Sequence, residues 1–350
     1  MSDRSQLSAP GSLSAPGSLQ NPTGITQAAA PAPGKPLAEL AAEYGLRPSA
    51  QRPGLVEYLG KLWQRRHFIL AFATARNVAT YTDARLGQVW QLLTPLLNVA
   101  VYYLVFGILF RQNKGVEHYI PYLVIGVFIF TFTERSLLNG SRVMYNNLQL
   151  ISALQFPRAS LPLAYVIVEL QQLLLSTVVM VAIVLVDHEP PTFYWFLVVP
   201  TLVLQSIFNI GACLFIARVG AQLNDVSQLV PFINRVWRYF CGVMYSIATL
   251  PTTVPNWAKD LLQFNPAAVY ISLTRYSLMS SQRANAPGAQ PYSAGKCAEF
   301  HAKMIPSLQA YCHPEVTTGE LWIAAAGWAV FAIVVGLLYF WRAESVYGRG

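Results

Sequence analysis

The sequence contains long stretches with few or no charges, and these limit the possible fold more than any other feature. Residues 86–110 form a run of 25 residues without a single charge. A helix of this length, rising 1.5 Å per residue, crosses the ~30 Å hydrocarbon core of a bilayer with some tilt. Over the whole chain 11% of the residues are charged, against about 25% in soluble domains. We therefore predict an all-α integral membrane protein.

Six segments are long and apolar enough to be transmembrane helices. They are residues 86–110, 119–141, 159–186, 192–217, 226–248 and 321–341. Ionisable side chains inside such segments cost about 2.5–3.5 kcal/mol each, so they usually face the protein interior and pair. These intramembrane charges are Glu134, Arg135, Glu169, Arg235 and Arg238. They are interpreted either as structural pairs and snorkelling side chains, or as a polar vestibule for an anionic or hydroxyl-rich substrate.

The chain before the first span divides into two parts. Residues 1–52 are rich in Ser, Pro, Ala and Gly and repeat the unit SAPGSL, which predicts a disordered tail. Residues 53–85 contain an amphipathic basic helix and a connector, and residues 86–350 form the transmembrane domain. The apolar side of the helix is made by Leu55, Tyr58, Leu59, Leu62 and Trp63. This pattern favours a helix lying flat at a membrane surface over a soluble core helix, because a span follows so closely.

Basic residues near the span ends predict the orientation. They gather in the N-terminal arm, in the loops after the second and fourth spans and at the C-terminal end, whereas residues 187–191 contain none. Lys and Arg are enriched on the cytoplasmic side of membrane proteins. Both termini are therefore predicted to be cytoplasmic, in a multi-pass protein of the plasma membrane.

Residues 146–162, NNLQLISALQFPRASLP, lie between two spans on the predicted cytoplasmic side. Leu148, Ile151 and Leu154 recur every third residue, so a short helix would carry an apolar ridge. Pro157 and Pro162 end that helix and restart the chain as the next span. The ridge suits docking of a soluble partner, and an interfacial turn resting on lipid headgroups is the alternative.

The segment 249–279 is apolar but broken by Pro251, Pro255 and Pro266, while residues such as Trp257 keep it hydrophobic. Short apolar helices interrupted by proline predict a re-entrant hairpin that enters from the outer face. Backbone of this kind must be buried in protein or line an aqueous cavity.

Residues 280–319 follow as a polar extracytoplasmic loop that contains two cysteines. A disulfide between Cys297 and Cys312 is favoured there over free thiols. A metal site formed with His301 and His313 is a weaker alternative because the spacing is irregular.

No catalytic motif is found in the sequence. It contains no G-x-x-x-x-G-K-[ST] phosphate loop, no G-x-S-x-G elbow and no H-E-x-x-H pair. The net charge of +8 is dispersed, which gives no sign of nucleic-acid binding. We predict no catalytic residue, no metal and no cofactor on this chain.

Aromatic residues make up 13% of the chain. Ring faces pack against the C–H faces of sugars and tyrosine hydroxyls hydrogen-bond them, so aromatic residues of the spans could line a passage. For any single ring, a lipid-facing or interfacial position is the alternative. The candidates are Tyr102, Phe128, Trp237, Tyr239, Phe240 and Tyr245.

Three patterns resemble those of ABC-2 type permeases, above all the exporters of O-antigen, capsule and teichoic acid. RLGQVW at 85–90, followed by LTP at 93–95, resembles the start of the family's first span. An Asn, a hydrophobic pair and FPRASLP, all within 146–162, resemble its cytoplasmic coupling helix. Asn265-Pro266 with Arg275 resembles its re-entrant outer helices.

Two further features qualify the resemblance. Asn224-Asp225 departs from the family pattern, because many relatives have Arg-Asp there. Residues 67–101 also resemble actinobacterial permeases that export the lipid-linked galactan precursor of arabinogalactan.

The resemblance implies a homodimer bound to two separate ABC ATPase subunits, which bind ATP and Mg²⁺. The substrate would be a polyprenyl-diphosphate-linked polysaccharide, galactan-like or O-antigen-like, moved outwards for cell wall biogenesis. The residues that would couple the permease to the ATPase are Asn146, Asn147, Leu148, Ile151, Leu154, Phe156, Pro157 and Arg158.

Two alternatives stay open. One is an ABC-2 exporter of teichoic acid, a drug or another small lipid. The other is a membrane glycosyltransferase acting on polyprenyl lipids, which would need acidic residues gathered at a membrane face. Its only candidates, Asp83, Glu134 and Asp225, do not cluster in the sequence.

Overall fold

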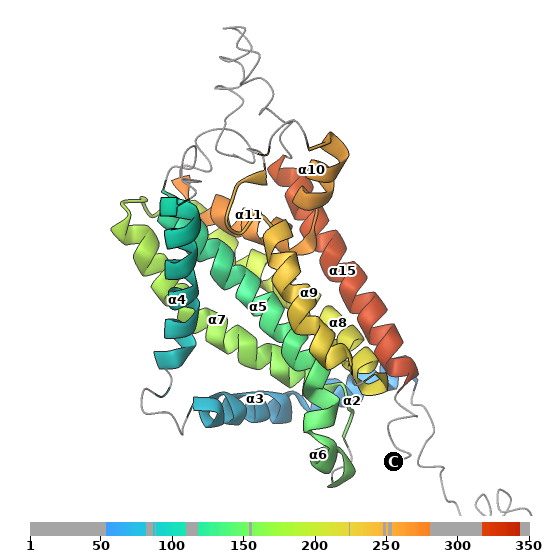
Figure 1. The fold of residues 1–350 in the computed structure, drawn as a ribbon. Coiled ribbons are helices and arrows are strands. Elements are labelled where there is room, and N and C mark those ends of the chain that lie inside the picture. Colours follow the sequence, from blue (N-terminus) through green and yellow to red (C-terminus); the bar gives the residue numbers. More distant parts are fainter. Residues whose placement is uncertain are drawn as a thin grey trace, which may run out of the picture. The chain divides into compact units, whose positions relative to one another are not determined.

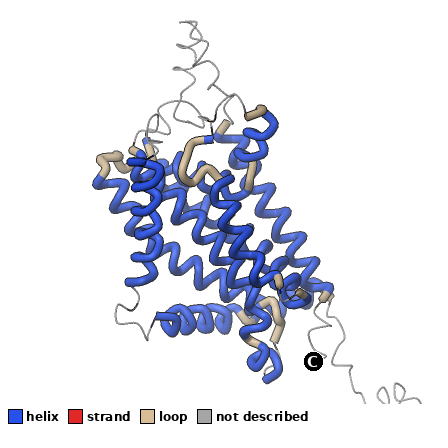
Figure 2. Tube along the Cα trace, in the orientation of Figure 1, coloured by secondary structure: helices blue, strands red, loops and turns tan. Residues whose placement is uncertain are grey.

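The structure is a computed structural model that describes residues 54–81, 87, 89–109, 118–153, 156–223, 225–247, 250, 254–280 and 317–343. The predicted tail 1–52, Leu154, Pro251 and the proposed Cys297–Cys312 disulfide lie outside these residues. Within the described ranges the regular structure is entirely helical and no strand occurs (Figure 2). The predicted all-α class is confirmed.

Five helical segments in the described part of the chain are long and apolar enough to cross a membrane. They match five of the six predicted spans to within a few residues. They are α4 (Val89–Tyr102) with η1 (Tyr103–Leu109), α5 (Tyr119–Asn146), α7 (Ser160–Val186), η2 (Phe193–Leu197) with α8 (Val198–Gln222), and α15 (Thr318–Arg342).

The predicted fifth span, residues 226–248, is not a single helix. Helix α9 (Val226–Phe240) ends after 15 residues, about 22 Å at 1.5 Å per residue and short of the ~30 Å hydrocarbon core. The chain then turns at Gly242, whose φ of 60° is in the left-handed region that favours glycine. Hydropathy could not reveal this end, because residues 241–248 are as apolar as a span.

Side chains from two other helices hold the turn after α9. Tyr119 and Tyr122 of α5 donate their hydroxyl hydrogens to carbonyls within residues 242–245, at 2.8 and 3.1 Å. Arg275 donates to two more carbonyls of the same turn, at 3.0 and 2.9 Å. The turn is therefore fixed to the bundle by hydrogen bonds to its backbone.

Two short helices, α10 (Asn256–Gln263) and α11 (Pro266–Leu278), occupy the segment predicted to be re-entrant. They lie at the upper end of the bundle in Figure 1, and α11 is buried along most of its length. Asn265 caps α11 by accepting from the backbone N–H of Ala267, and Pro266 is its first residue, where proline is well tolerated. That α10 and α11 enter a membrane stays a prediction.

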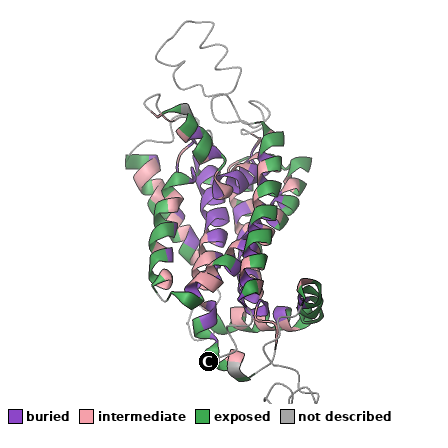
Figure 3. Cartoon of the chain, turned by 90° about the vertical axis from the view of Figure 1, so that its right-hand side faces the viewer, coloured by how far each residue is buried: buried purple, intermediate pink, exposed green. Residues whose placement is uncertain are grey.

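Helix α5 lies inside the bundle, and buried residues gather on the inner sides of the helices (Figure 3). Helices α8 and α15 approach closely because Gly211 and Gly336 have no side chains. A Cβ added to Gly336 would lie 2.0 Å from the carbonyl oxygen of Gly211. Small residues in this arrangement commonly bring membrane helices into contact.

The lower end of the bundle in Figure 1 carries α2 (Leu55–Gln64), α3 (Arg66–Tyr81) and α6 (Leu148–Ala153). We call this the α6 end. Helix α3 runs across the ends of the spanning helices and packs against α7. The sequence predicted a connector here and missed this second helix. Its apolar residues Phe68, Ile69, Phe72 and Ala73 join a separate hydrophobic cluster at the α6 end.

Candidate functional site

The segment predicted to dock a partner leaves α5 at Asn147. Its buried side chain donates to the carbonyl of Val143 at 2.7 Å and to the hydroxyl of Tyr165 on α7 at 3.1 Å. These two bonds fix the direction in which α6 leaves the bundle. Within α6, Leu148 is 56% exposed, whereas Ile151 is half-buried against the hydrophobic cluster. The predicted apolar ridge is thus divided between an outward and an inward residue.

The chain after α6 returns to the bundle through contacts with α2 and α3. The ring of Phe156 lies 5.6 Å from the ring of Phe68, and the hydroxyl of Tyr58 accepts from the backbone N–H of Ala159 at 3.2 Å. Asn146 is exposed, and Pro157 and Arg158 are half-buried. Helices α2 and α3 therefore pack on the same segment that contains α6.

Helix α2 forms where the amphipathic helix was predicted, but its apolar side is divided. Tyr58 and Leu62 are buried against the rest of the protein. Leu59 and Trp63 are exposed, Trp63 by 71%, and Leu55 is half-buried. That the exposed half lies on a membrane stays a prediction.

Two predicted intramembrane charges form one ion pair. Arg238 of α9 bonds the carboxylate of Glu134 on α5 and also the hydroxyl of Tyr102 on α4. Its guanidinium lies 5.3 Å from the ring centre of Phe130. This cluster joins α4, α5 and α9 through one cation.

Arg235 differs from Arg238, one helical turn away. It is exposed and has no hydrogen bond or ion pair to any residue within the described part of the chain. It lies at the edge of an apolar stripe that is exposed on α9, which we call the α9 stripe. The stripe consists of Leu229, Phe232, Ile233, Val236, Tyr239 and Phe240.

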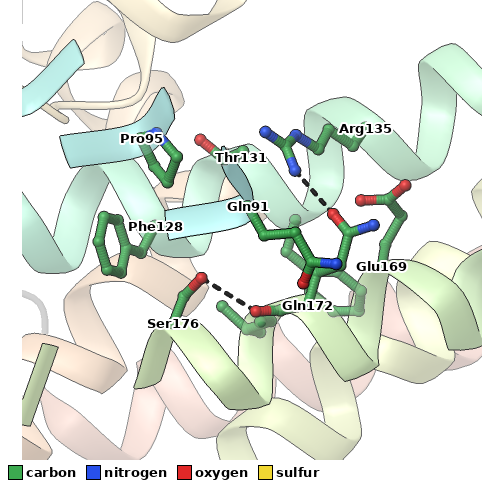
Figure 4. Close-up of a pocket in the computed structure, with 10 residues that line it drawn as sticks. Gln91, Pro95, Phe128, Thr131, Arg135, Glu169, Gln172 and Ser176 are labelled. Carbon is green, nitrogen blue, oxygen red and sulfur yellow. Dashed lines mark hydrogen bonds between the residues drawn. The ribbon is translucent and has the colours of Figure 1, made fainter. Parts of the chain in front are cut away.

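The remaining two intramembrane charges line a cavity between α4, α5 and α7 (Figure 4). Glu169 is 4% exposed and accepts from Asn139 Nδ2 at 2.7 Å. Arg135 donates to Gln172 Oε1 at 2.7 Å. Each charge is therefore bonded to an amide, and the two do not pair with each other. The other residues lining this polar cavity are Gln91, Pro95, Phe128, Thr131, Phe132, Gln172, Leu173 and Ser176.

The six aromatic residues predicted to line a passage do not converge. Phe128 is buried at the polar cavity, and Tyr239 and Phe240 are exposed on the α9 stripe. Trp237 donates its Nε1 hydrogen to Asn265 at 2.9 Å, and the Tyr245 hydroxyl donates to the carbonyl of Tyr239. Tyr102 is bonded to Arg238, as described above.

Uncharged amides are the polar residues that the sequence analysis overlooked. Asn77, Gln91 and Gln172 meet beside the polar cavity, where both glutamines donate to Oδ1 of Asn77. Their side chains carry no charge, so the cost of a charge in lipid does not point to them. A glutamine in an apolar run, such as Gln91 or Gln172, also needs a partner in lipid and was a usable signal.

The model of the ABC-2 type transporter family matches residues 69–279. The O-antigen export system permease protein RfbA of Myxococcus xanthus is 23% identical over 246 residues, which is 69% of this chain and 90% of that protein. A protein of the same description from Klebsiella pneumoniae is 25% identical over 192 residues, or 55% and 72% of the two chains.

A third relative is the inner membrane transport permease YadH of Escherichia coli K12, 25% identical over 206 residues, or 56% of this chain and 78% of that protein. The family match covers more than half of the chain and includes α4 to α11. The chain belongs to the ABC-2 type transporter family.

Proposed function

We propose that this chain is the membrane permease subunit of an ATP-driven exporter of lipid-linked polysaccharide. The observation that carries the proposal is the similarity to O-antigen export permeases over most of their length. Since the sequence has no phosphate-binding loop, ATP hydrolysis is assigned to a separate ABC ATPase subunit.

The ATPase docks at the α6 end in this proposal. Leu148 supplies the exposed apolar contact, and Asn147 and Phe156 hold α6 and its return segment against the bundle. The basic residues of α2 and α3 support placing this end in the cytosol. Movement of the ATPase would reach the spans through α2, α3 and α6 because these helices share one hydrophobic cluster.

The α9 stripe supports a lipid-linked anionic substrate. An unpaired arginine facing hydrocarbon costs about 2.5–3.5 kcal/mol on insertion scales. A polyprenyl diphosphate offsets this cost, because its phosphates bind Arg235 while its chain covers the apolar side chains beside it. A second copy of the permease facing α9 would enclose the glycan at a dimer seam.

The glycan is proposed to be O-antigen-like or galactan-like, and an export assay tests the proposal. Depletion of the protein is expected to accumulate one polyprenyl-diphosphate-linked glycan inside the cell, and re-expression to clear it. Cells that re-express the Arg235→Gln variant are expected to clear the accumulated glycan poorly. Cells that re-express Arg235→Lys are expected to clear it better, because lysine retains the positive charge. The control is Gln228→Ala, an exposed change two turns earlier on α9. Depletion without any accumulated lipid-linked glycan would refute the proposed function.

A further inference from the structure

The side chain of Asn77 joins three helices at the α6 end. Its Oδ1 accepts from Nε2 of Gln91 on α4 at 3.1 Å and from Nε2 of Gln172 on α7 at 3.3 Å. Its Nδ2 donates to Oε1 of Gln171 on α7 at 3.3 Å. One amide of α3 therefore makes hydrogen bonds to α4 and to α7 at the same time. We call Asn77, Gln91, Gln171 and Gln172 the amide joint.

Helix α4 depends on this joint at its first turn. The buried residues of α4 are Gln91, Pro95 and Val99, and the first of them is the one bonded to Asn77. The flanking Val89 and Trp90 are exposed. The one fully buried side chain in the first turn of α4 is thus an amide that is hydrogen-bonded to Asn77.

The joint opens onto the polar cavity, which Gln91 and Gln172 also line. The cavity is small, about 20 Å³, which is enough for a water molecule, and it has further polar walls from Arg135, Glu169 and Ser176. Water entering there can replace an amide–amide bond at small cost, because it donates and accepts equally well. Water cannot replace an apolar contact in this way, because separating two apolar side chains exposes hydrocarbon to water.

We infer that Asn77 is a positioning residue through which α3 sets the separation of α4 and α7. When α3 holds the two amides together the polar cavity is narrow, and when α3 moves away water takes the place of Asn77 and the cavity widens. The joint itself follows from the hydrogen bonds above. Its part in transport rests on the proposed function, in which the ATPase moves α2, α3 and α6.

The reactivity of a thiol in the cavity tests the joint directly. Ser176 is 7% exposed, and Ser176→Cys places a thiol on the cavity wall. Its modification by a small thiosulfonate reagent is read by mass spectrometry of the peptide that contains residue 176. Asn77→Leu removes the bonds to all three glutamines, and the thiol in this variant is expected to react about tenfold faster.

Two control variants distinguish the loss of the amide joint from general damage to the protein. Asn77→Asp keeps the oxygen that accepts from Gln91 and Gln172, so it is expected to react at the rate of the parent. Thr80→Ala changes an exposed residue of α3 whose hydroxyl donates only within its own helix. The thiol in this variant is also expected to react at the rate of the parent. An unchanged rate in Asn77→Leu, or an equal rise in Asn77→Asp, would overturn the inference. If Asn77→Leu does not fold, Gln91→Leu carries the same expectation.

A second measurement, on the permease bound to its ATPase, tests the part in transport. Asn77→Leu is expected to lower glycan exported per ATP hydrolysed while ATP hydrolysis continues, and Asn77→Asp to restore it. If Asn77→Leu lowers the rates of glycan export and of ATP hydrolysis in proportion, a positioning role is contradicted. The two claims can fail separately. If Asn77→Leu changes the thiol reactivity but the parent complex exports no glycan, the proposed function is refuted. If Asn77→Leu leaves the thiol reactivity unchanged and the parent complex exports glycan normally, the role of the joint is refuted.

Discussion

Arg238 illustrates how charges are accommodated inside this bundle. It comes from α9, bonds Glu134 of α5 and Tyr102 of α4, and is only 14% exposed at its side chain. Removing one member of a buried ion pair leaves the other charge without compensation, which costs more than replacing both by apolar groups.

Arg238→Leu is therefore expected to lower the free energy of unfolding by about 1–3 kcal/mol, because the part-buried Glu134 loses its counter-ion. The double variant Glu134→Leu with Arg238→Leu is expected to recover much of that loss. Arg235→Leu, one turn away and unpaired in the described structure, is the matched control and should not lower stability. Thermal unfolding in detergent measures all three, and equal destabilisation by Arg235→Leu and Arg238→Leu would contradict the pairing.

Residue pairing could be predicted from the sequence only in general terms. The cost of a charge in lipid predicts that Glu134, Glu169 and Arg238 have partners. It does not predict which partners, because a periodic pattern gives the face of a helix and not the neighbouring helix. Glu169 bonds Asn139 and not an arginine, and the sequence offers no means of choosing between them.

At the scale of elements, length and hydropathy located five of the spanning segments well, since a run of 20 or more apolar residues has few alternatives. They located α9 poorly because the chain stays apolar past Phe240. Its end is set by the turn at Gly242 and by hydrogen bonds from α5 and from Arg275. These interactions join residues more than 30 positions apart and leave no local signal.

The contact between α8 and α15 provides a test at this scale. Gly336→Ala places a methyl group 2.0 Å from the carbonyl oxygen of Gly211, so the two helices must separate. Overpacking of this kind typically costs about 1–3 kcal/mol. The matched control is Gly327→Ala in the same helix, where a Cβ meets no atom within 4 Å. A lower melting temperature is expected for Gly336→Ala alone, and equal melting temperatures would contradict the close approach.

At the scale of the whole transmembrane unit, the two ends of the bundle differ in kind. The α6 end carries three helices outside the spans, a hydrophobic cluster of its own and many basic residues. The opposite end carries α10, α11 and the fixed turn after α9. In our proposal the first end receives mechanical work and the second is where the glycan leaves.

This division allows one contact to be broken without disturbing the bundle. Leu148 is exposed on α6, whereas Ile151 is half-buried against the hydrophobic cluster. A charge at Ile151 would disturb folding and docking together. Leu148→Asp is therefore the better test, because it is expected to disturb docking without disturbing folding.

The most direct test of the account is co-purification of the co-expressed ATPase subunit with the full-length permease. The parent protein and Pro190→Asp, an exposed change at the opposite end, are expected to retain the ATPase. Leu148→Asp is expected to lose it while keeping the melting temperature of the parent. Retention of the ATPase by Leu148→Asp at the level of the parent would contradict the claim that this permease receives its power through α6.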